Sequence, residues 1–334
     1  MLSRRKQIRV SGINSGLILG QPAPHTLAEY LSVEGLLSSL GNSDVTDELV
    51  IDYPGAAKNW ASPKSQSPQR HLIRLEPEVV LPANYSKLRK ADFRTIITVG
   101  GDPQKYSVTV PWPQEIPSEL AHLEGIDSSR FEKAVLVNGN KLSFVRGEFY
   151  SLRRRAILEI KGLDLYGTSW DSNRLLRSKL LVKALAQAVL SGRLPRLSGI
   201  RGWFKSYPQW KGSIGSGYSP SRPETKLAKM AEYKYALVIE NSKDYMSEKL
   251  FDAFVAGCIP IYVGPRIENY GIPGDLVIQS EPNLIAICQG LERAKEINFV
   301  EFHKNLRAFL TSQKTISKWS RKSVYKMILE ALND

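Results

Sequence analysis

Between residues 133 and 296 the sequence alternates short apolar runs with longer stretches of helical spacing. Runs such as KAVLVN and YALVIE have the length and β-branched content of buried strands, whereas RLLRSKLLVKALAQAVLSG repeats apolar residues three and four positions apart. Regular alternation of this kind is typical of βαβ units around a parallel sheet. We therefore expect an α/β domain with a central parallel sheet over residues 121–300.

The first part of the chain predicts a second domain, over residues 1–120. The runs ELVIDY, HLIRLE and FRTIITVGG are typical of strands, and HTLAEYLSVEGLLSSLG has helical spacing. The proline-rich segment YSVTVPWPQEIPSEL has the composition of a connector and places the boundary near residue 120. A length of 334 residues also suits two domains better than one core. Residues 301–334 predict one or two amphipathic helices, and residues 202–226 predict a long irregular loop.

Composition indicates a soluble globular protein, with 42% hydrophobic and 24% charged residues. No apolar run approaches the roughly 20 residues that span a bilayer. The basic N-terminus is followed by an apolar part that Ser, Gly and Asn interrupt, which makes it a poor export signal. Cys258 and Cys288 both lie in apolar surroundings and are expected to be reduced core thiols. We therefore expect a cytoplasmic protein.

The net charge of +13 allows an anionic partner, but charge alone decides little, because solvated helix faces and a basic tail account for most of the basic clusters. Nucleic acid, an anionic membrane surface and an anionic small substrate are the three candidates. The basic clusters SRRKQIR, KLRK, SLRRR and KWSRKSVYK do not interleave aromatics as a base-stacking surface would, so no nucleic acid is expected. Peripheral contact between the basic C-terminal tail and the inner face of an anionic membrane stays open.

The stretch ENSKDYMSEKLFDAFVAG follows a strand and places Lys249 where a helix should begin. We expect this helix to start at Asp244, which can cap it, and to end at Gly257. A lysine there opposes the helix dipole by a few tenths of a kcal/mol. An anion bound at the carboxyl edge of the sheet would offset that cost, and Glu248 would then accept hydrogen bonds from ribose hydroxyls. The alternative is a surface Glu–Lys pair on an ordinary helix.

The longer segment YKYALVIENSKDYMSEKLFDAFVAGCIPIYVG resembles the signature of the α-1,3-fucosyltransferase family. The resemblance implies an inverting glycosyltransferase that uses GDP-fucose. It also implies the GT-B architecture, in which two Rossmann-like domains with parallel sheets face each other across a cleft. The C-terminal half would bind the donor and the N-terminal half the acceptor. The matching residues are Tyr233, Lys234, Glu240, Asn241, Ser242, Asp244, Tyr245, Glu248, Lys249, Gly257 and Pro260.

The same resemblance implies which residues bind the donor. The segment AVLVNGNKLSFVRGEFYSLRRRAILEIKGLDLYG is similar to the opening of the family's donor domain, in which an arginine contacts the pyrophosphate. The alignment favours Arg154, with Arg153 and Arg155 as close rivals and a solvated basic helix face as the alternative. Tyr245 would add a hydroxyl near the phosphates. The expected donor-binding set is Arg154, Glu240, Asn241, Ser242, Tyr245, Glu248 and Lys249.

The run RHLIRLEPEVV falls where the family has a strand ending in its proposed catalytic glutamate, which is Glu76 here. A carboxylate is the natural base for an acceptor hydroxyl when no histidine is placed for the task. Glu78 is a rival, because it points to the same side of an extended chain. The sequence departs from the family at Leu75, where a small residue is usual. An exposed strand-end glutamate is the alternative to a catalytic one.

No metal or other cofactor is expected, because the sequence has no Asp-x-Asp pair and His25, His71, His122 and His303 are scattered. The expected partners are GDP-fucose, as donor substrate, and an acceptor oligosaccharide. One alternative keeps the fold and uses another GDP-linked deoxyhexose. A second alternative is a non-catalytic protein that binds a nucleotide or nucleic acid.

Overall fold

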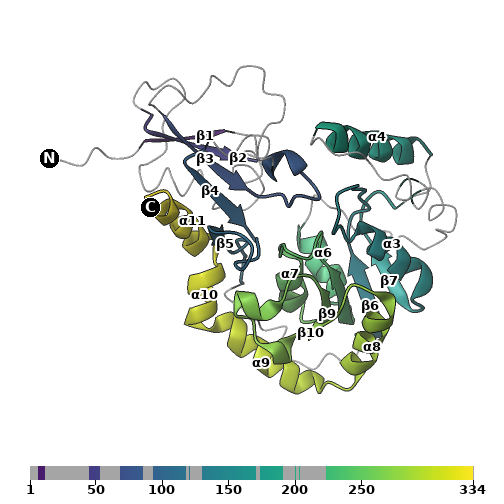
Figure 1. The fold of residues 1–334 in the computed structure, drawn as a ribbon. Helices are drawn as coiled ribbons and strands as arrows, with labels where there is room; N and C mark the ends of the chain where they lie inside the picture. The colour runs from purple at the N-terminus through teal and green to yellow at the C-terminus, as the bar shows by residue number, and fades with distance from the viewer. Residues whose placement is uncertain are drawn as a thin grey trace.

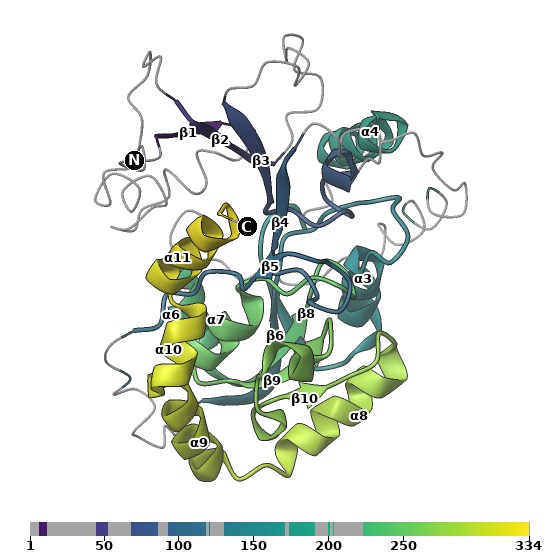
Figure 2. The same cartoon turned by 60° about the vertical axis from the view of Figure 1, so that its left-hand side comes forward.

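The computed structural model shows two parallel β-sheets, each covered by helices (Figures 1 and 2). The predicted α/β class is confirmed. The structure describes residues 7–11, 45–52, 68–85, 93–117, 120, 130–170, 174–190, 200, 203 and 223–333. The helix expected over residues 25–41 and most of the loop expected over residues 202–226 lie outside these ranges.

The first sheet consists of five parallel strands whose spatial order is their order in the sequence. Its middle strands have long apolar side chains, and Leu49, Ile73 and Ile97 are fully buried in its core. The strands are β1 (Ile8–Ser11), β2 (Asp47–Ile51), β3 (Gln69–Arg74), β4 (Thr95–Val99) and β5 (Thr109–Val110).

The second sheet also has five parallel strands, in the order β10-β9-β8-β6-β7. The chain passes from β6 to β7 in one direction and later builds β8, β9 and β10 in the other direction. The crevice between β6 and β8 is therefore the topological switch point, where open α/β sheets bind ligands at the carboxyl ends of their strands. The strands are β6 (Phe131–Val137), β7 (Leu163–Tyr166), β8 (Tyr233–Ile239), β9 (Ile259–Val263) and β10 (Ile278–Gln279).

Helices cover both faces of the second sheet, with α3 and α8 on one side and α6 and α7 on the other (Figure 2). Within the described part of the chain, no helix has the length and apolar character needed to cross a membrane. The helices are α3 (Tyr150–Glu159), α4 (Arg174–Leu190), α6 (Pro223–Met230), α7 (Lys249–Val255), α8 (Leu284–Lys295), α9 (Phe299–Thr311), α10 (Gln313–Trp319) and α11 (Arg321–Ala331), with the 3-10 turns η1 (Pro82–Tyr85), η4 (Ile267–Tyr270) and η5 (Gly274–Leu276).

The C-terminal segment forms three helices where one or two were expected, and it joins the two sheets. Leu306 and Leu310 of α9 are buried in the core of the second sheet. Val324 and Ile328 of α11 are buried in the core of the first sheet instead. The last helix therefore returns to the N-terminal half, as Figure 1 shows.

The two halves also meet where the backbone leaves β4. The carbonyl oxygen of Gly100 accepts hydrogen bonds from the Met246 N–H at 2.8 Å and the Tyr270 hydroxyl at 3.1 Å. The Asp102 N–H donates to the Asp244 carbonyl at 3.1 Å. Gly100 has a φ of +70°, and a Cβ at this residue would lie 2.1 Å from the Met246 carbonyl oxygen. Only glycine allows this approach of the two backbones.

The first prediction concerns this contact. Gly100→Ala should lower the free energy of unfolding by about 1–3 kcal/mol, because it adds left-handed strain and overlaps a carbonyl oxygen. Gly274→Ala is the matched control, since its added Cβ would meet no atom within 4 Å and its φ is not positive. Urea denaturation measures both variants. Equal stability of the two would mean that the halves do not depend on this contact.

Candidate active site

Glu240 directly follows β8, and its carboxylate is completely buried. It accepts hydrogen bonds from the Ser247 N–H at 2.9 Å and the Ser247 hydroxyl at 2.7 Å. The Lys249 ammonium completes the set at 3.3 Å from Glu240. Lys249 is the first residue of α7. The lysine at the positive end of this helix thus has an attractive partner, a buried carboxylate, that outweighs the helix dipole.

The helix expected from Asp244 begins only at Lys249, with Glu248 at its N-cap position. Asp244 does not cap it. Its carboxylate instead binds the Lys105 ammonium of the N-terminal half and accepts a hydrogen bond from the Ser242 hydroxyl at 2.9 Å. The segment from residue 240 to residue 248 is therefore a loop. The side-chain hydrogen bonds and the ion pair of Glu240, Asp244 and Ser247 hold it in place.

The three consecutive arginines on α3 have different surroundings. Arg153 is buried and donates to the Ile239 carbonyl at 3.1 Å and the Asn241 side-chain oxygen at 3.0 Å. Arg154 is also buried; it donates to the Lys141 carbonyl at 2.7 Å and contacts the ring of Trp203. Arg155 is exposed and pairs with a glutamate of its own helix. Arg153 therefore reaches the end of β8 at the switch point, while Arg154 supports the loop after β6.

Tyr245 connects the loop to the N-terminal half. Its side chain is 3% exposed, and its hydroxyl donates to the Leu75 carbonyl oxygen. The phenol therefore joins the two halves of the molecule. Burial holds the pKa of this hydroxyl well above its ordinary value, which keeps it protonated and able to donate.

Glu76 lies just beyond the end of β3, in a turn that a buried aspartate organises. The backbone N–H groups of Leu75 and Glu76 donate to one oxygen of Asp52, at 2.9 and 3.1 Å. Burial raises the pKa of the Glu76 carboxyl above its ordinary value; Lys141 and Lys249 oppose this shift, and Asp52 adds to it. Glu76 therefore interacts electrostatically with two lysines of the C-terminal half.

Lys141 is a member of the site that the sequence reasoning missed. It follows β6 on the same sheet edge as Glu240, and its side chain reaches solvent. The surrounding protein lowers its pKa by limiting hydration; Glu76 opposes this change and Lys249 reinforces it. Its position after the buried strand β6, at the switch point, could have identified it from the sequence. The loop that contains Lys141 has no hydrophobic periodicity, so the sequence pattern did not single it out.

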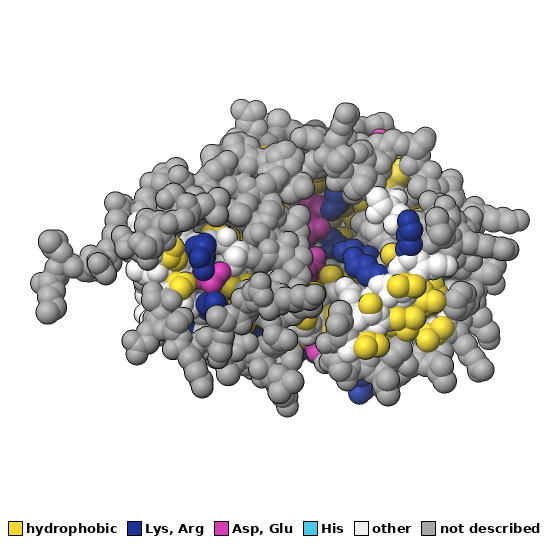
Figure 3. Space-filling model, turned by 90° about the horizontal axis from the view of Figure 1, so that it is seen from above, with side chains coloured by type: hydrophobic (Ala, Val, Ile, Leu, Met, Phe, Trp, Pro, Cys, Tyr) yellow, Lys and Arg dark blue, Asp and Glu magenta, His cyan; other side chains and the backbone are white. Residues whose placement is uncertain are grey.

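Glu248 is an ionised carboxylate of the site. Burial alone would raise its pKa, but Lys249 and Lys226, whose ammonium groups lie 4.0 and 3.8 Å away, hold it at about 2. Its side chain is 41% exposed, so it is both ionised at neutral pH and accessible. Figure 3 shows basic and acidic side chains next to one another in a hollow in the middle of one face.

Of the four histidines, the two within the described ranges are engaged elsewhere. His71 lies 3.0 Å from the Asp47 carboxylate, and the ring of His303 lies 2.8 Å from the Gly257 carbonyl oxygen. His25 and His122 lie outside the described residues. Nowhere in the described ranges do three or more His, Cys, Asp or Glu side chains gather as a metal site would need.

Comparison with known proteins finds relatives of the segment that contains the loop of residues 240–248. Residues 208–282 match the model of glycosyltransferase family 10 (fucosyltransferase), C-terminal part. The resemblance to the fucosyltransferase family is confirmed. The chain is 50% identical over 52 residues to human 4-galactosyl-N-acetylglucosaminide 3-alpha-L-fucosyltransferase 9, and 38% identical over 82 residues to bovine alpha-(1,3)-fucosyltransferase 4. These matches span 14% and 21% of the length of those relatives and the same shares of this chain.

Solved structures establish the fold over nearly the whole chain. An alpha1,3-fucosyltransferase crystallised with GDP has a TM-score of 0.53 at 13% identity, covering 100% of this chain and 93% of that protein. T4 phage beta-glucosyltransferase has a TM-score of 0.51 at 12% identity, covering 98% of this chain and 100% of that protein. Sucrose-phosphate synthase from Thermosynechococcus elongatus has a TM-score of 0.55 at 10% identity, covering 98% of this chain and 98% of that protein. The predicted GT-B-like fold is confirmed.

The second prediction tests the structural role of Lys249 as the cation that pairs with the buried carboxylate of Glu240. Lys249→Met should lower the free energy of unfolding by about 3 kcal/mol, because it leaves the Glu240 carboxylate buried without its cation. Adding Glu240→Gln removes that charge and should restore most of the lost stability. Chemical denaturation of both single variants and the double variant gives the coupling energy. Additive losses would show that the pair does not act as one unit.

Proposed function

We propose that this protein transfers L-fucose from GDP-fucose to a hydroxyl of an acceptor glycan, with inversion, as an α-1,3-fucosyltransferase-like enzyme. One observation carries the proposal. The Tyr245 hydroxyl of the C-terminal half binds the carbonyl of Leu75, the residue before Glu76, so that the Glu76 carboxylate interacts electrostatically with Lys141 and Lys249. A base and a cluster of cations from opposite halves are what an inverting sugar transfer between two bound substrates requires.

Glu76 is the proposed general base. An acceptor hydroxyl is a weak nucleophile and must lose its proton as the bond to the sugar forms. A carboxylate whose pKa burial has raised is, once ionised, a stronger base than an ordinary glutamate and accepts that proton more readily. Asp52 supports this role, because one of its oxygens accepts hydrogen bonds from the successive backbone N–H groups of Leu75 and Glu76 and so fixes the turn.

The lysines are proposed to stabilise the leaving group. As the bond between fucose and GDP breaks, negative charge grows on the diphosphate while the sugar becomes oxocarbenium-like. Glu240 and Ser247 hold the Lys249 ammonium at the edge of the sheet before the reaction, so its charge needs little rearrangement when it is used, and Lys141 follows β6 at the same edge. Glu248, ionised and accessible, is suited to accept hydrogen bonds from ribose hydroxyls. We propose that no metal ion takes part.

The third prediction tests donor binding and transfer together. The protein should release GDP from GDP-fucose when an acceptor oligosaccharide from a panel is added, and excess EDTA should not stop it. Lys141→Met should weaken GDP binding about 10- to 100-fold, the scale of one charge-assisted hydrogen bond. Calorimetry with GDP measures this loss.

Lys161→Met is the matched control for that test. Lys161 lies after α3, at the opposite edge of the same sheet, so its removal changes net charge equally but leaves the site intact. If both variants weakened GDP binding equally, the loss would come from the change in net charge and not from a contact made by Lys141. Turnover of another GDP-deoxyhexose in place of GDP-fucose would keep the reaction and change the donor. Loss of activity in EDTA that manganese restores would refute the metal-free mechanism.

The fourth prediction concerns Glu76. Glu76→Gln keeps the size of the side chain but removes the base, and should lower kcat by roughly 10²–10⁴-fold. GDP affinity should not fall, because the change removes a negative charge that interacts with Lys141 and Lys249. In the unchanged protein, activity should rise with pH through an apparent pKa above that of an ordinary glutamate, because the base works only when ionised. Glu78→Gln serves as the comparison. Normal turnover of Glu76→Gln together with an inactive Glu78→Gln would transfer the role to Glu78.

A further inference from the structure

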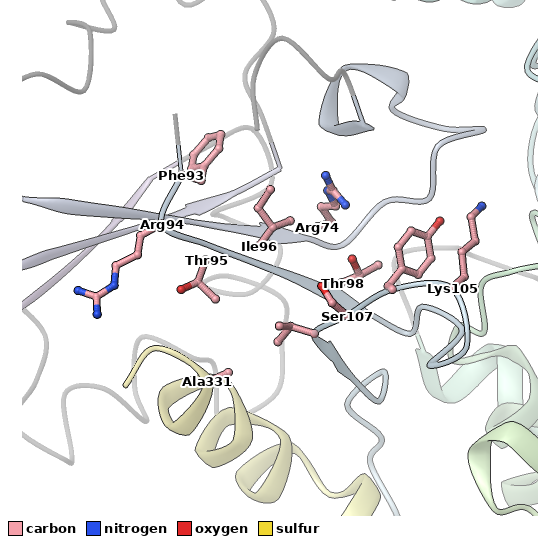
Figure 4. Close-up of a pocket in the computed structure, with 11 residues that line it drawn as sticks. Arg74, Phe93, Arg94, Thr95, Ile96, Thr98, Lys105, Ser107 and Ala331 are labelled. Atoms are coloured by element: carbon pink, nitrogen blue, oxygen red, sulfur yellow. The ribbon is translucent and has the colours of Figure 1, made fainter. Parts of the chain in front are cut away.

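A pocket of about 580 Å³ lies on the first sheet, beside the part of β4 that β5 leaves unpaired (Figure 4). Glu76, Lys141, Glu248 and Lys249 are not among the residues that line it. Side chains from β3, β4, the segment before β5 and the last helix surround it. The residues that line it are Arg74, Phe93, Arg94, Thr95, Ile96, Thr98, Lys105, Tyr106, Ser107, Val108 and Ala331.

Arg74 is the buried cation of this pocket. It is the last residue of β3 and pairs with Thr98 of β4. Only 5% of it is exposed. Its Nε donates to the Asn84 carbonyl at 2.9 Å, and its guanidinium lies 4.5 Å from the centre of the Tyr85 ring. These two contacts, both from the η1 turn, hold the planar guanidinium in one place.

No carboxylate of a described residue lies within ion-pair distance of Arg74. The other two cations that line the pocket differ from it. Lys105 is paired with Asp244, and Arg94 is exposed and donates to Gln69. Burial lowers the pKa of Arg74, while Tyr85, Tyr106 and the more distant Glu78 raise it. An arginine nonetheless stays protonated in proteins, so the pocket contains a buried positive charge.

A buried charge without a counter-ion is costly, and such a group is expected to have a partner that binds it. The guanidinium fork matches an oxyanion, above all a planar carboxylate. Thr98, Tyr106 and Ser107 add hydroxyl groups around the same space, and Figure 4 shows Thr98 and Ser107 side by side below Arg74. The pocket therefore has both the charge and the hydrogen-bonding groups to hold a carboxylate on a sugar.

We propose that this pocket binds a carboxylate of the acceptor, so that the acceptor is an acidic oligosaccharide. The inference rests on the proposed transfer reaction and names its substrate class. Arg74 lies two residues before Glu76, at the same end of β3. An acidic sugar held by Arg74 therefore sits on the acceptor side of the molecule, close to the proposed base.

The test is calorimetry on the full chain without donor. The two ligands are a uronic-acid-containing oligosaccharide and the same oligosaccharide with its carboxyl groups reduced to hydroxymethyl groups. The unchanged protein should bind the acidic form at least about 10-fold more tightly, the scale of a hydrogen bond to a charged group. Arg74→Met should abolish that preference, and Arg74→Lys should keep only part of it. Arg293→Met, which removes an exposed arginine from the last turn of α8, outside the pocket, is the matched control and should retain the preference.

Thermal unfolding distinguishes a ligand site from a structural arginine. Arg74→Met should be at least as stable as the unchanged protein, because it removes an unpaired buried charge. A large fall in its Tm would instead make the Asn84 and Tyr85 contacts the reason for the arginine and would overturn the proposal. Equal binding of the acidic and reduced oligosaccharides would overturn it as well. So would Arg74-dependent binding of inorganic phosphate in the absence of any binding of the acidic oligosaccharide.

The outcomes for this pocket and for the proposed reaction can be told apart. Efficient transfer to neutral acceptors by a protein that does not prefer acidic ones would overturn the pocket assignment alone. A clear preference for the acidic oligosaccharide that Arg74→Met abolishes would support the pocket, even in a protein that fails to bind GDP and so contradicts the transfer reaction.

Discussion

The buried carboxylate of Glu240 is the interaction on which the arrangement of the site depends. A carboxylate in the interior must be fully hydrogen-bonded and paired, and Ser247 and Lys249 supply the partners within the next nine residues. The chain between them is consequently closed into a compact loop. Tyr245 and Met246, within that loop, are thereby directed to the first sheet. A single buried charge in the C-terminal half thus determines where the N-terminal half is bound.

The contacts between the halves place the proposed base relative to the donor side. The Tyr245 hydroxyl binds the carbonyl of Leu75, the residue directly before Glu76. Gly100 brings the backbone of the first half against Met246, the residue directly after Tyr245. Two bonds from adjacent loop residues therefore reach the ends of two neighbouring strands, β3 and β4. Helix α11 also packs against the first sheet. The C-terminal segment therefore forms a second connection between the two halves.

The sequence predicted elements whose pattern is local and missed contacts that depend on distant partners. The strands β8 and β9 are continuous apolar runs, so their burial could be predicted from composition and length. Lys249 was correctly placed at a helix start, but its buried partner, Glu240, lies nine residues earlier and only folding brings them together. Asp244 has the chemistry of a helix cap and uses it across the junction instead. An amphipathic helix such as α11 shows that one face is buried, but not which of two sheets covers it.

The two acidic side chains of the site illustrate how neighbouring charges divide the roles. Burial raises the pKa of both carboxyl groups and Lys249 lowers both. At Glu76 burial prevails, and Asp52 adds to it, whereas at Glu248 the two lysines Lys249 and Lys226 together prevail. Glu248 stays charged through the working range of pH, and Glu76 is the group able to exchange a proton. A donor diphosphate bound to Lys141 and Lys249 would offset their positive charge. The pKa of Glu76 would then rise further, so that binding of the donor itself would strengthen the base.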